Sequence, residues 1–320
     1  MSVRAGAPHI GATVVIGETL IDVVPDENGV RELPGGSPAN VAVALGRLGR
    51  EPVLVTTLGD DERGTAARRW LEASEVTVLA QPSPTGRTST AAVLLAEDGS
   101  ASYDFDLTWD LSAATLDRAI ALGDLAVVHA GSIATVLDPG AEAVEAALRA
   151  ARGRALVTFD PNARPAITPD VTRVLPRVER LAAASDVVKM SEEDSAWYRP
   201  GGDPVALARS WAAAGAVLVV VTRGADGGVL VRGDDVIDVP GVPVPVADTI
   251  GAGDTFMGAL IDALIGLGAH GPAAREVLAK LRIEELHRAA SWAVSAAAVT
   301  VSRPGADPPT RAELGEVPDR

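Results

Sequence analysis

Short runs of apolar residues alternate along the chain with longer segments in which apolar residues recur every three or four positions. The short runs are apolar almost throughout, as expected for parallel strands whose two faces are both covered by helices. The segments 142–152 and 204–214 have the spacing of helices. This alternation predicts an α/β fold with a doubly wound, mainly parallel sheet flanked by helices. The expected strands are Thr13–Gly17, Val53–Thr57, Leu125–His129, Ala155–Phe159, Asp186–Lys189 and Val217–Thr222.

Two segments break this alternation. Segment 20–34 carries a turn at Asp26–Gly29 between short strand-like pieces, and segment 87–107 has the pattern of a hairpin around Asp98–Gly99. The second segment alternates polar and larger residues after its turn, which suits a sheet with one face in water. We therefore predict one domain over residues 10–310, with both segments inserted into it as a small β-sheet lid.

The composition limits the partners that this chain could bind. Of its 320 residues 47% are hydrophobic and 22% are charged, as in ordinary globular proteins, but the net charge is -15. An excess of negative charge repels nucleic acid and anionic membranes, so we expect neither as a partner. The chain contains no cysteine, which excludes disulfides and thiolate chemistry, and its only lysines are Lys189 and Lys280.

The two ends of the chain give further expectations. Residues 1–9 lack an apolar core of signal-peptide length, and no apolar run reaches the ~18 residues of a membrane span. We therefore expect a cytoplasmic protein. The segment after Gly305 is rich in proline and charge, so we expect it to be loosely held, with residues 311–320 as a tail.

A glycine pair precedes an apolar-periodic helix at Gly35–Asn40, which reads GGSPAN. Paired glycines allow the backbone to approach a ligand closely. Ser37 is a good N-cap and Pro38 a good first helical residue. Asn40 would lie in the first turn, where its amide offers a donor and an acceptor to hydroxyls. The alternative is a plain loop-to-helix start with a good cap.

A second motif, DTIGAGDTF, spans Asp248–Phe256 and also leads into a helix. The small residues 251–253 would expose successive N–H groups at a helix start, where the helix dipole favours anions. Asp254 would lie in the first turn, near enough to take a proton from an attacking hydroxyl. The alternative is a helix N-terminus that an acidic residue stabilises by under ~1 kcal/mol.

Together the two motifs resemble the signatures of the PfkB, or ribokinase-like, carbohydrate kinase family. GGSPANVAVALGRLG at 35–49 is similar to the N-terminal signature, and DTIGAGDTF at 248–256 is similar to the C-terminal one. The resemblance covers about residues 10–310. It implies a ribokinase-like fold and an ATP-dependent enzyme that phosphorylates a sugar hydroxyl. In this family the lid often also forms a dimer interface, so the resemblance implies a homodimer that associates through the lid.

The resemblance assigns roles to individual residues. Asp254 would be the catalytic base, and Gly251, Ala252 and Gly253 would form the anion hole. The residues expected to contact the sugar are Asp22, Gly35, Gly36, Asn40, Phe105 and Arg164. The residues expected to contact the nucleotide are Lys189, Thr222, Gly224 and Gly227. Phe105 is included because Tyr103, Phe105 and Trp109 fall in or beside the lid, where an aromatic ring could cover the sugar or simply pack.

Metal ions are implied at two places. Family members commonly carry Asn-x-x-Glu where this chain has SEED at 191–194, so Asp194 or Glu193 would support Mg²⁺ with its water shell. Asp248 and the carbonyl of Ile250 match positions that hold a monovalent cation in many members, which makes K⁺ a possible cofactor.

The identity of the sugar stays open at this point. Members that act on sugar phosphates often have lysine where this chain has Ser37, and GGSPAN is more similar to fructokinases. The DPNAR stretch at 160–164 is similar to an element of fructokinases and 2-keto-3-deoxygluconate kinases. Asp104 and Asp106 in the lid would oppose a carboxylate, although Arg87 and Arg164 could still serve one. Fructose is therefore favoured, with 2-keto-3-deoxygluconate, ribose and nucleosides as alternatives. A catalytically silent relative that binds sugar or nucleotide is a further one.

Other motifs favour no competing function. The chain has no G-x-x-x-x-G-K-[ST] sequence for a Walker-type phosphate loop, and GLGAHG at 266–271 follows a helix, so it is a helix C-cap loop. The four histidines have no metal-ligand spacing. His129 with Ser132 is expected to be a strand end rather than a nucleophile pair, because no partner acid can be argued.

Overall fold

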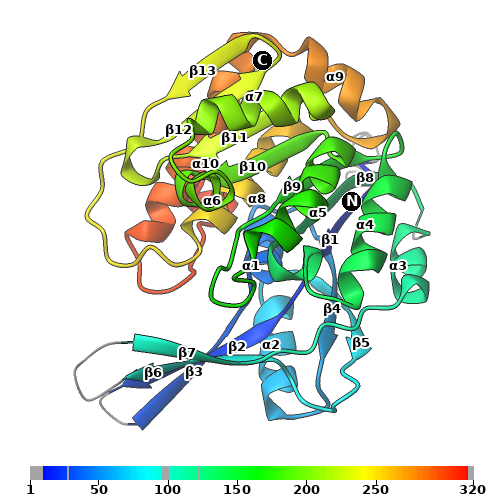
Figure 1. Ribbon diagram of the computed structural model, residues 1–320, viewed down its shortest axis with the longest axis vertical. Helices are drawn as coiled ribbons and strands as arrows, with labels where there is room; N and C mark the ends of the chain where they lie inside the picture. Colours follow the sequence, from blue (N-terminus) through cyan, green and yellow to red (C-terminus); the bar gives the residue numbers. More distant parts are fainter. Residues whose placement is uncertain (1–9, 27–28, 96–100, 122, 316–320) are drawn as a thin grey trace, which may run out of the picture.

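The computed structural model describes residues 10–26, 29–95, 101–121 and 123–315. Its centre is a nine-stranded sheet in the order β13-β12-β11-β10-β9-β8-β1-β4-β5 (Figure 1). All neighbours from β11 to β5 pair in parallel, whereas β12 and β13 form an antiparallel hairpin on the β11 edge. The strands are β1 Ala12–Ile16, β4 Val53–Leu58, β5 Thr77–Pro82, β8 Leu125–Gly131, β9 Leu156–Asp160, β10 Val187–Ser191, β11 Leu218–Thr222, β12 Gly228–Arg232 and β13 Asp235–Val239.

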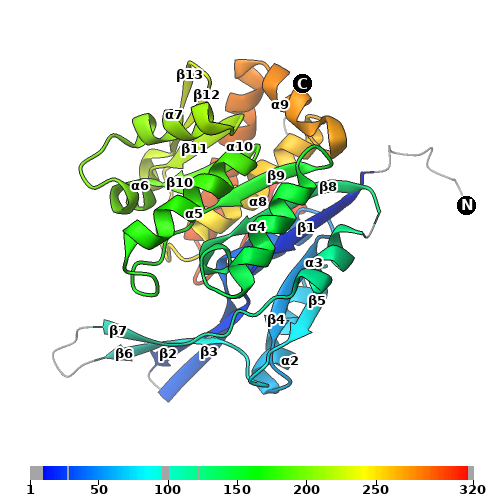
Figure 2. The same ribbon diagram turned by 45° about the vertical axis from the view of Figure 1, so that its right-hand side comes forward.

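Helices cover both faces of this sheet, as predicted, and each face has its own hydrophobic core. Successive strand residues point to opposite faces. Val127 therefore packs with α1, α8 and α10, whereas its neighbour Val128 packs with α3, α4 and α5. Figure 2 shows the two helix layers on either side of the sheet. The helices are α1 Ser37–Arg47, α2 Glu62–Glu72, α3 Ala113–Ile120, α4 Gly140–Ala151, α5 Val171–Ala184, α6 Glu192–Tyr198, α7 Pro204–Ala214, α8 Ala252–Gly266, α9 Ala274–Lys280, α10 Ile283–Val301 and α11 Arg311–Leu314, with 3₁₀ turns η1 Ser132–Thr135, η2 Gly224–Asp226 and η3 Gly271–Ala273.

A second, four-stranded sheet projects from the body of the molecule (Figure 1). Its order is β3-β2-β6-β7, with two antiparallel hairpins joined by a parallel pairing of β2 with β6. The strands are β2 Leu20–Asp26, β3 Gly29–Gly35, β6 Thr90–Leu95 and β7 Ala101–Asp106. These strands come from the two segments that break the alternation in the sequence. The predicted turn at Asp98–Gly99 lies outside the described residues.

The C-terminal segment corrects one expectation, because it is bound to the domain as far as α11. The carboxylate of Asp262 is fully buried in α8 and receives ion pairs from Arg50 at 2.6 Å and Arg311 at 2.5 Å. The Arg311 guanidinium also lies 5.5 Å from the centre of the Trp292 ring. A buried carboxylate needs such partners. The segment 306–314 is therefore tied down by charge, which its proline-rich composition did not reveal.

No single helix of the described residues is long and apolar enough to cross a membrane. Helix α8 meets the length and composition criteria only together with residues 271–280, as a pair bent by 101°. Twelve residues of α8 are buried inside the protein, so its apolar character serves the core.

Candidate active site

The predicted site residues gather where the parallel strands end. Gly131, Asp160, Ser191 and Thr222 are the last residues of β8, β9, β10 and β11. The carboxyl ends of parallel strands meet at one edge of a sheet, and ligands of open α/β sheets bind outside that edge. Residues that are distant in the sequence can therefore act on one ligand there.

Asp254 joins the two signature motifs. It lies in the first turn of α8 as predicted, and its side chain is buried. Its Oδ1 accepts a hydrogen bond from Ser37 Oγ at 2.6 Å, and its Oδ2 accepts one from Asn40 Nδ2 at 2.8 Å. Asn162 Nδ2 approaches Oδ1 at 3.5 Å. Two segments more than two hundred positions apart thus hold one carboxylate in a fixed orientation, as a base needs.

The start of α1 differs from the expectation in a way that affects the site. The N-cap is Gly36 rather than Ser37, and no side chain caps the helix. Gly36 has φ 107°, and a Cβ there would lie 2.5 Å from the carbonyl oxygen of Glu18. Only glycine fits this position without strain. Because Ser37 is already the first helical residue, its hydroxyl is free to bind Asp254.

A buried ammonium lies at the start of α8. Gly251 has φ 75° and turns the chain into the helix, and a Cβ on Gly253 would lie 2.9 Å from Lys189 Nζ. The Lys189 ammonium is buried and forms a 2.9 Å ion pair with Asp160. Together with the free N–H groups of the helix start, this ammonium can bind a transferring phosphoryl group.

The charges of this ion pair follow from its surroundings. Burial alone would lower the pKa of Lys189, but Asp160, Asp194 and Asp254 raise it above its ordinary value, so the ammonium keeps its proton. Burial raises the pKa of Asp160 to about 6 against the opposing effect of Lys189. At pH 7 both partners are therefore ionised.

Asp22 lies at the junction of the small sheet and the body. A Cβ on Gly35 would lie 2.4 Å from Asp22 Oδ2, so glycine at 35 makes room for this carboxylate. Burial raises the pKa of Asp22 to about 6, and the nearby Arg164 charge lowers it in part. Arg164 itself is exposed and donates to Asn162 Oδ1 at 2.6 Å. The structure thus brings Asp22, Gly35 and Arg164 near one another, as a shared sugar site requires.

The aromatic residues of the lid separate into different groups. Trp109 is buried, its indole N–H donates to the carbonyl oxygen of Ala134 at 2.9 Å, and it packs against Gly140. The reading of Trp109 as a sugar cover is therefore wrong. Phe105 lies in β7 opposite Ala91 and is half-buried, and the side chain of Tyr103 lies outside the described residues.

Comparison with known proteins decides the family. Residues 12–313 match the pfkB family carbohydrate kinases. The chain belongs to this family. It is therefore a carbohydrate kinase, a phosphotransferase whose acceptor is an alcohol group. The predicted fold and family are confirmed.

Several relatives of this kinase are fructokinases. The one from Rhizobium leguminosarum bv. trifolii is 37% identical over 255 residues, which make up 78% of each chain. The crystal structure of a fructokinase double mutant from Vibrio cholerae O395, in its fructose-, ADP- and potassium-bound form, matches with TM-score 0.81 at 26% identity, over 95% of this chain and 97% of that one. The ATP-bound fructokinase from Xylella fastidiosa matches with TM-score 0.81 at 26% identity, over 92% and 93%.

The residues expected to contact the nucleotide lie next to the Lys189 strand. Thr222 ends β11, which is the neighbour of β10, and its hydroxyl approaches the Met190 carbonyl oxygen at 3.5 Å. Gly224 and Gly227 follow in the loop around η2 with φ 53° and 84°. A Cβ on Gly227 would lie 2.2 Å from the carbonyl oxygen of Val239, so glycine is required there. The kinase thus has a tight backbone loop at the strand edge, where nucleotides bind in this class of sheet.

The two carboxylates proposed for magnesium differ in their exposure and in their hydrogen bonds to the protein. Asp194 Oδ1 accepts from the Ala163 N–H at 2.7 Å, and its Oδ2 accepts from the Ser191 N–H at 2.8 Å in a capping box. Glu193 is exposed beside it. No three His, Asp or Glu side chains of the described residues form a ready-made metal cage. Mg²⁺ usually binds to one or two carboxylates together with substrate phosphates, which this donor set fits.

Asp248 and Ile250 lie together in the turn before Gly251. Asp248 Oδ1 accepts from the Ile250 N–H at 3.0 Å, and Oδ2 accepts from the Gly305 N–H at 2.9 Å. Asp248 therefore connects the turn that precedes α8 to the segment that follows α10. Each of its oxygens keeps a second lone pair for a cation.

The sequence analysis gave no role to Glu18 or to Asn162, although it named the DPNAR stretch that contains Asn162. Glu18 is buried, and its Oε2 accepts from the Ala134 N–H at 3.2 Å. Burial raises the pKa of Glu18 to about 7, although a hydrogen bond with Ser132 opposes this. An acidic residue between the apolar residues of GETL was a usable signal for Glu18. Asn162 has φ 36°, which nothing in the sequence indicates.

The structure shows the surroundings of two other motifs, the GLGAHG sequence and His129. Helix α8 ends at Gly266, so GLGAHG is a helix-end loop, as predicted. His129 is buried within β8 and its Nδ1 is 2.9 Å from the Thr158 hydroxyl. Burial, and then the charge of Lys189, lower the pKa of His129 to about 3, so the ring is neutral.

Proposed function

We propose that this kinase transfers the γ-phosphoryl group of ATP to a hydroxyl of fructose. The observation that carries the proposal is the buried Asp254 carboxylate, held by Ser37 and Asn40 at the start of α8, where the Lys189 ammonium also lies. A base and an anion site next to each other are the two parts that phosphoryl transfer to an alcohol needs. The fructokinases among its relatives support the choice of sugar.

In this mechanism the sugar lies between the small sheet and the body. Asp22 accepts hydrogen bonds from sugar hydroxyls and orients the ring. The acceptor hydroxyl gives its proton to Asp254 as its oxygen forms a bond to the γ-phosphorus. The bond from that phosphorus to the bridging oxygen breaks, and ADP leaves. The N–H groups of residues 251–253 and the Lys189 ammonium stabilise the charge on the transferring group.

We further propose that Mg²⁺ and K⁺ act as cofactors. Mg²⁺ would neutralise phosphate charge, with Glu193 as the carboxylate free to reach its water shell. The Asp248 carboxylate and the Ile250 carbonyl would hold K⁺ behind the turn that forms the anion site. The test compares activity with Mg²⁺ and after exhaustive chelation, and with K⁺ replaced by Na⁺; full turnover without divalent metal would contradict the first part.

A neutral sugar fits the charges around the lid better than a sugar acid. Arg87, which could have bound a carboxylate, lies 3.0 Å from Asp106 in an exposed ion pair, so a sugar acid would have to displace Asp106. Asp104 in the same strand is exposed and adds another negative charge. The other arginine considered for a carboxylate, Arg164, has its guanidinium bonded to Asn162. A ketodeoxygluconate carboxylate would therefore meet more repulsion than attraction.

The deciding experiment measures ADP release with a panel of fructose, ribose, 2-keto-3-deoxygluconate and adenosine. Fructose should give the highest kcat/KM, because the pocket pairs a specific set of hydroxyls. A strong preference for another panel member would refute the choice of fructose and leave the kinase activity intact. Sugar binding without ADP release on any substrate would instead favour a silent binding protein.

We also propose that two copies associate through the small sheet, in the cytoplasm, where ATP is available. Val30 in β3 is 64% exposed, so the projecting sheet presents a large apolar side chain to solvent. Sedimentation of the kinase and of a Val30→Asp variant tests this. A monomer at micromolar concentration, or a dimer that the variant leaves unchanged, would contradict it.

A further inference from the structure

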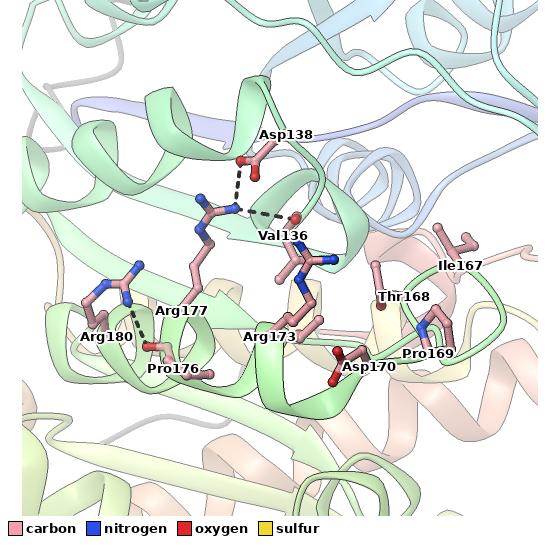
Figure 3. A pocket seen from close by; sticks show the side chains of 11 residues that line it. Val136, Asp138, Ile167, Thr168, Pro169, Asp170, Arg173, Pro176, Arg177 and Arg180 are labelled. Carbon is pink, nitrogen blue, oxygen red and sulfur yellow. Dashed lines mark hydrogen bonds and ion pairs between the residues drawn. The ribbon is translucent and has the colours of Figure 1, made fainter.

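A cavity of about 450 Å³ lies beside α5, and none of the predicted site residues lines it (Figure 3). One wall is the loop and first turns of α5, and the other is the chain that follows η1. Its volume is in the range of cavities that bind small metabolites. The lining residues are Val136, Asp138, Ile167, Thr168, Pro169, Asp170, Arg173, Val174, Pro176, Arg177 and Arg180.

Three arginines of α5 line this cavity, in a protein of net charge -15. Arg177 Nη1 donates to Asp138 Oδ1 at 2.8 Å and approaches the Val136 carbonyl oxygen at 3.4 Å. Arg180 is paired with Glu145 at 2.9 Å. The Arg173 side chain is exposed and has no hydrogen bond or ion pair within the described part of the chain. Arg173 therefore offers an unused guanidinium at the cavity wall.

Among the described residues, neither of the two lining carboxylates forms an ion pair with Arg173. Asp170 caps α5 by accepting from the Thr172 N–H at 3.0 Å and from its hydroxyl at 2.6 Å. The Asp138 side chain is 63% exposed, whereas its partner Arg177 is 18% exposed. Such an exposed carboxylate is easily displaced. An incoming anion would thus replace Asp138 as the hydrogen-bond partner of Arg177.

We propose that this cavity binds a small molecule with a phosphate monoester group, held between Arg173 and Arg177. A planar guanidinium binds two oxygens of one phosphate at once, which a lysine cannot do. The apolar side chains of Val136, Ile167 and Val174 would face the carbon part of the ligand. Thr168 adds a hydroxyl to the rim of the site.

Both walls of the cavity lead directly to the active site. Thr168 donates through its N–H at 2.9 Å and through its hydroxyl at 3.2 Å to the carbonyl oxygen of Arg164, the residue beside Asp22. On the other wall, Val136 follows η1, whose Ala134 N–H binds Glu18. A ligand that bridges the two walls would hold both loops in place. We therefore expect it to tighten sugar binding, and by linkage the sugar would tighten its binding equally.

The binding test uses glycerol 3-phosphate and inorganic phosphate as probes in titration calorimetry on the full-length kinase. Arg173→Gln should weaken glycerol 3-phosphate binding about ten- to a hundredfold, because it removes a charged hydrogen-bond donor. Asp138→Asn should strengthen it, because it removes the competing carboxylate. The matched control is Arg154→Gln, an exposed arginine before β9, which should change nothing.

The outcomes separate this site from the active site, which also attracts phosphate. Equal binding by the wild type and Arg173→Gln would overturn the proposal, because the anion would then lie elsewhere. Absence of binding to the wild type at millimolar concentration would overturn it too. The Kd of fructose with and without glycerol 3-phosphate tests the coupling, and an unchanged Kd refutes that part. These are binding measurements, so they stand even if the kinase phosphorylates another sugar.

Discussion

Replacement of Asp254 by asparagine tests the centre of the proposed mechanism. In the proposed mechanism this carboxylate is the proton acceptor in the transfer step, and an amide could not take that proton. A positioned general base contributes about 10²–10⁴-fold in rate, which is about 2.7–5.5 kcal/mol of activation free energy. We expect Asp254→Asn to lower kcat by that factor, with little change in the Kd of ATP or sugar.

The surrounding hydrogen bonds explain why the variant should stay folded. The amide oxygen of an asparagine can accept from Asn40 as the carboxylate does. The amide nitrogen would face Ser37, whose hydroxyl can turn to accept instead of donate. The exchange replaces charge-assisted bonds by neutral ones, so we expect a loss of about 1 kcal/mol in the free energy of unfolding.

The assay measures kcat, the sugar Kd and the melting temperature on one preparation of each variant. The matched control is Asp117→Asn, an exposed aspartate on α3, which should leave all three unchanged. If Asp254 only supports the helix start, the asparagine variant will keep most of its activity. A folded Asp254→Asn kinase with more than about a tenth of wild-type kcat would refute the role as base.

Three further predictions follow from the hydrogen bonds and charges around the site. Ser37→Ala should lower kcat about tenfold without weakening ATP binding, since Asp254 loses its 2.6 Å hydrogen bond, and single-turnover kinetics would show this. Burial raises the pKa of both Asp22 and Asp160 to about 6, so kcat/KM for the sugar should fall below pH 6; Asp22→Asn should make that limb of the pH profile shallower. Glu18 has its pKa raised from 4.5 to about 7 on folding, so its stabilising contribution is complete below pH 4.5 and is lost as the pH rises through 7. Glu18→Gln should therefore match the wild type in denaturant unfolding at pH 4 and exceed it by about 3 kcal/mol at pH 8, and equal stability at pH 8 would contradict the buried charge.

The strands of the central sheet were the most predictable part of the fold. β4, β8 and β11 begin within a residue of the predicted positions, because strands covered on both faces are apolar throughout. The analysis missed β5, β12 and β13. β5 and β13 expose part of their residues to water, so their sequences lack that continuous apolar signal. β12 is different: four of its five residues, GVLVR, are buried, so its apolar run was a usable signal.

The site was predictable to the level of its motifs but not of its contacts. The first-turn position of Asp254 followed from the small residues before it. The hydrogen bond from Ser37 to Asp254 could not be predicted in the same way. A helix-capping rule predicts only a bond from the Ser37 hydroxyl to its own helix, whereas Asp254 lies in another helix more than two hundred positions away. The burial of Trp109 and the ion pair of Arg311 with Asp262 likewise depend on tertiary neighbours. Such pairings leave no periodic trace in a single sequence.

The burial of Lys189 has a practical consequence for chemical labelling. The chain has two lysines, and the amine of Lys189 is enclosed and protonated by its pairing with Asp160. The side chain of Lys280 is 71% exposed, at the end of α9 and far from the small sheet (Figure 1). Apart from the amino terminus, an amine-reactive dye or support should therefore attach at one place. The kinase could be immobilised through α9 with the Lys189 ammonium unmodified.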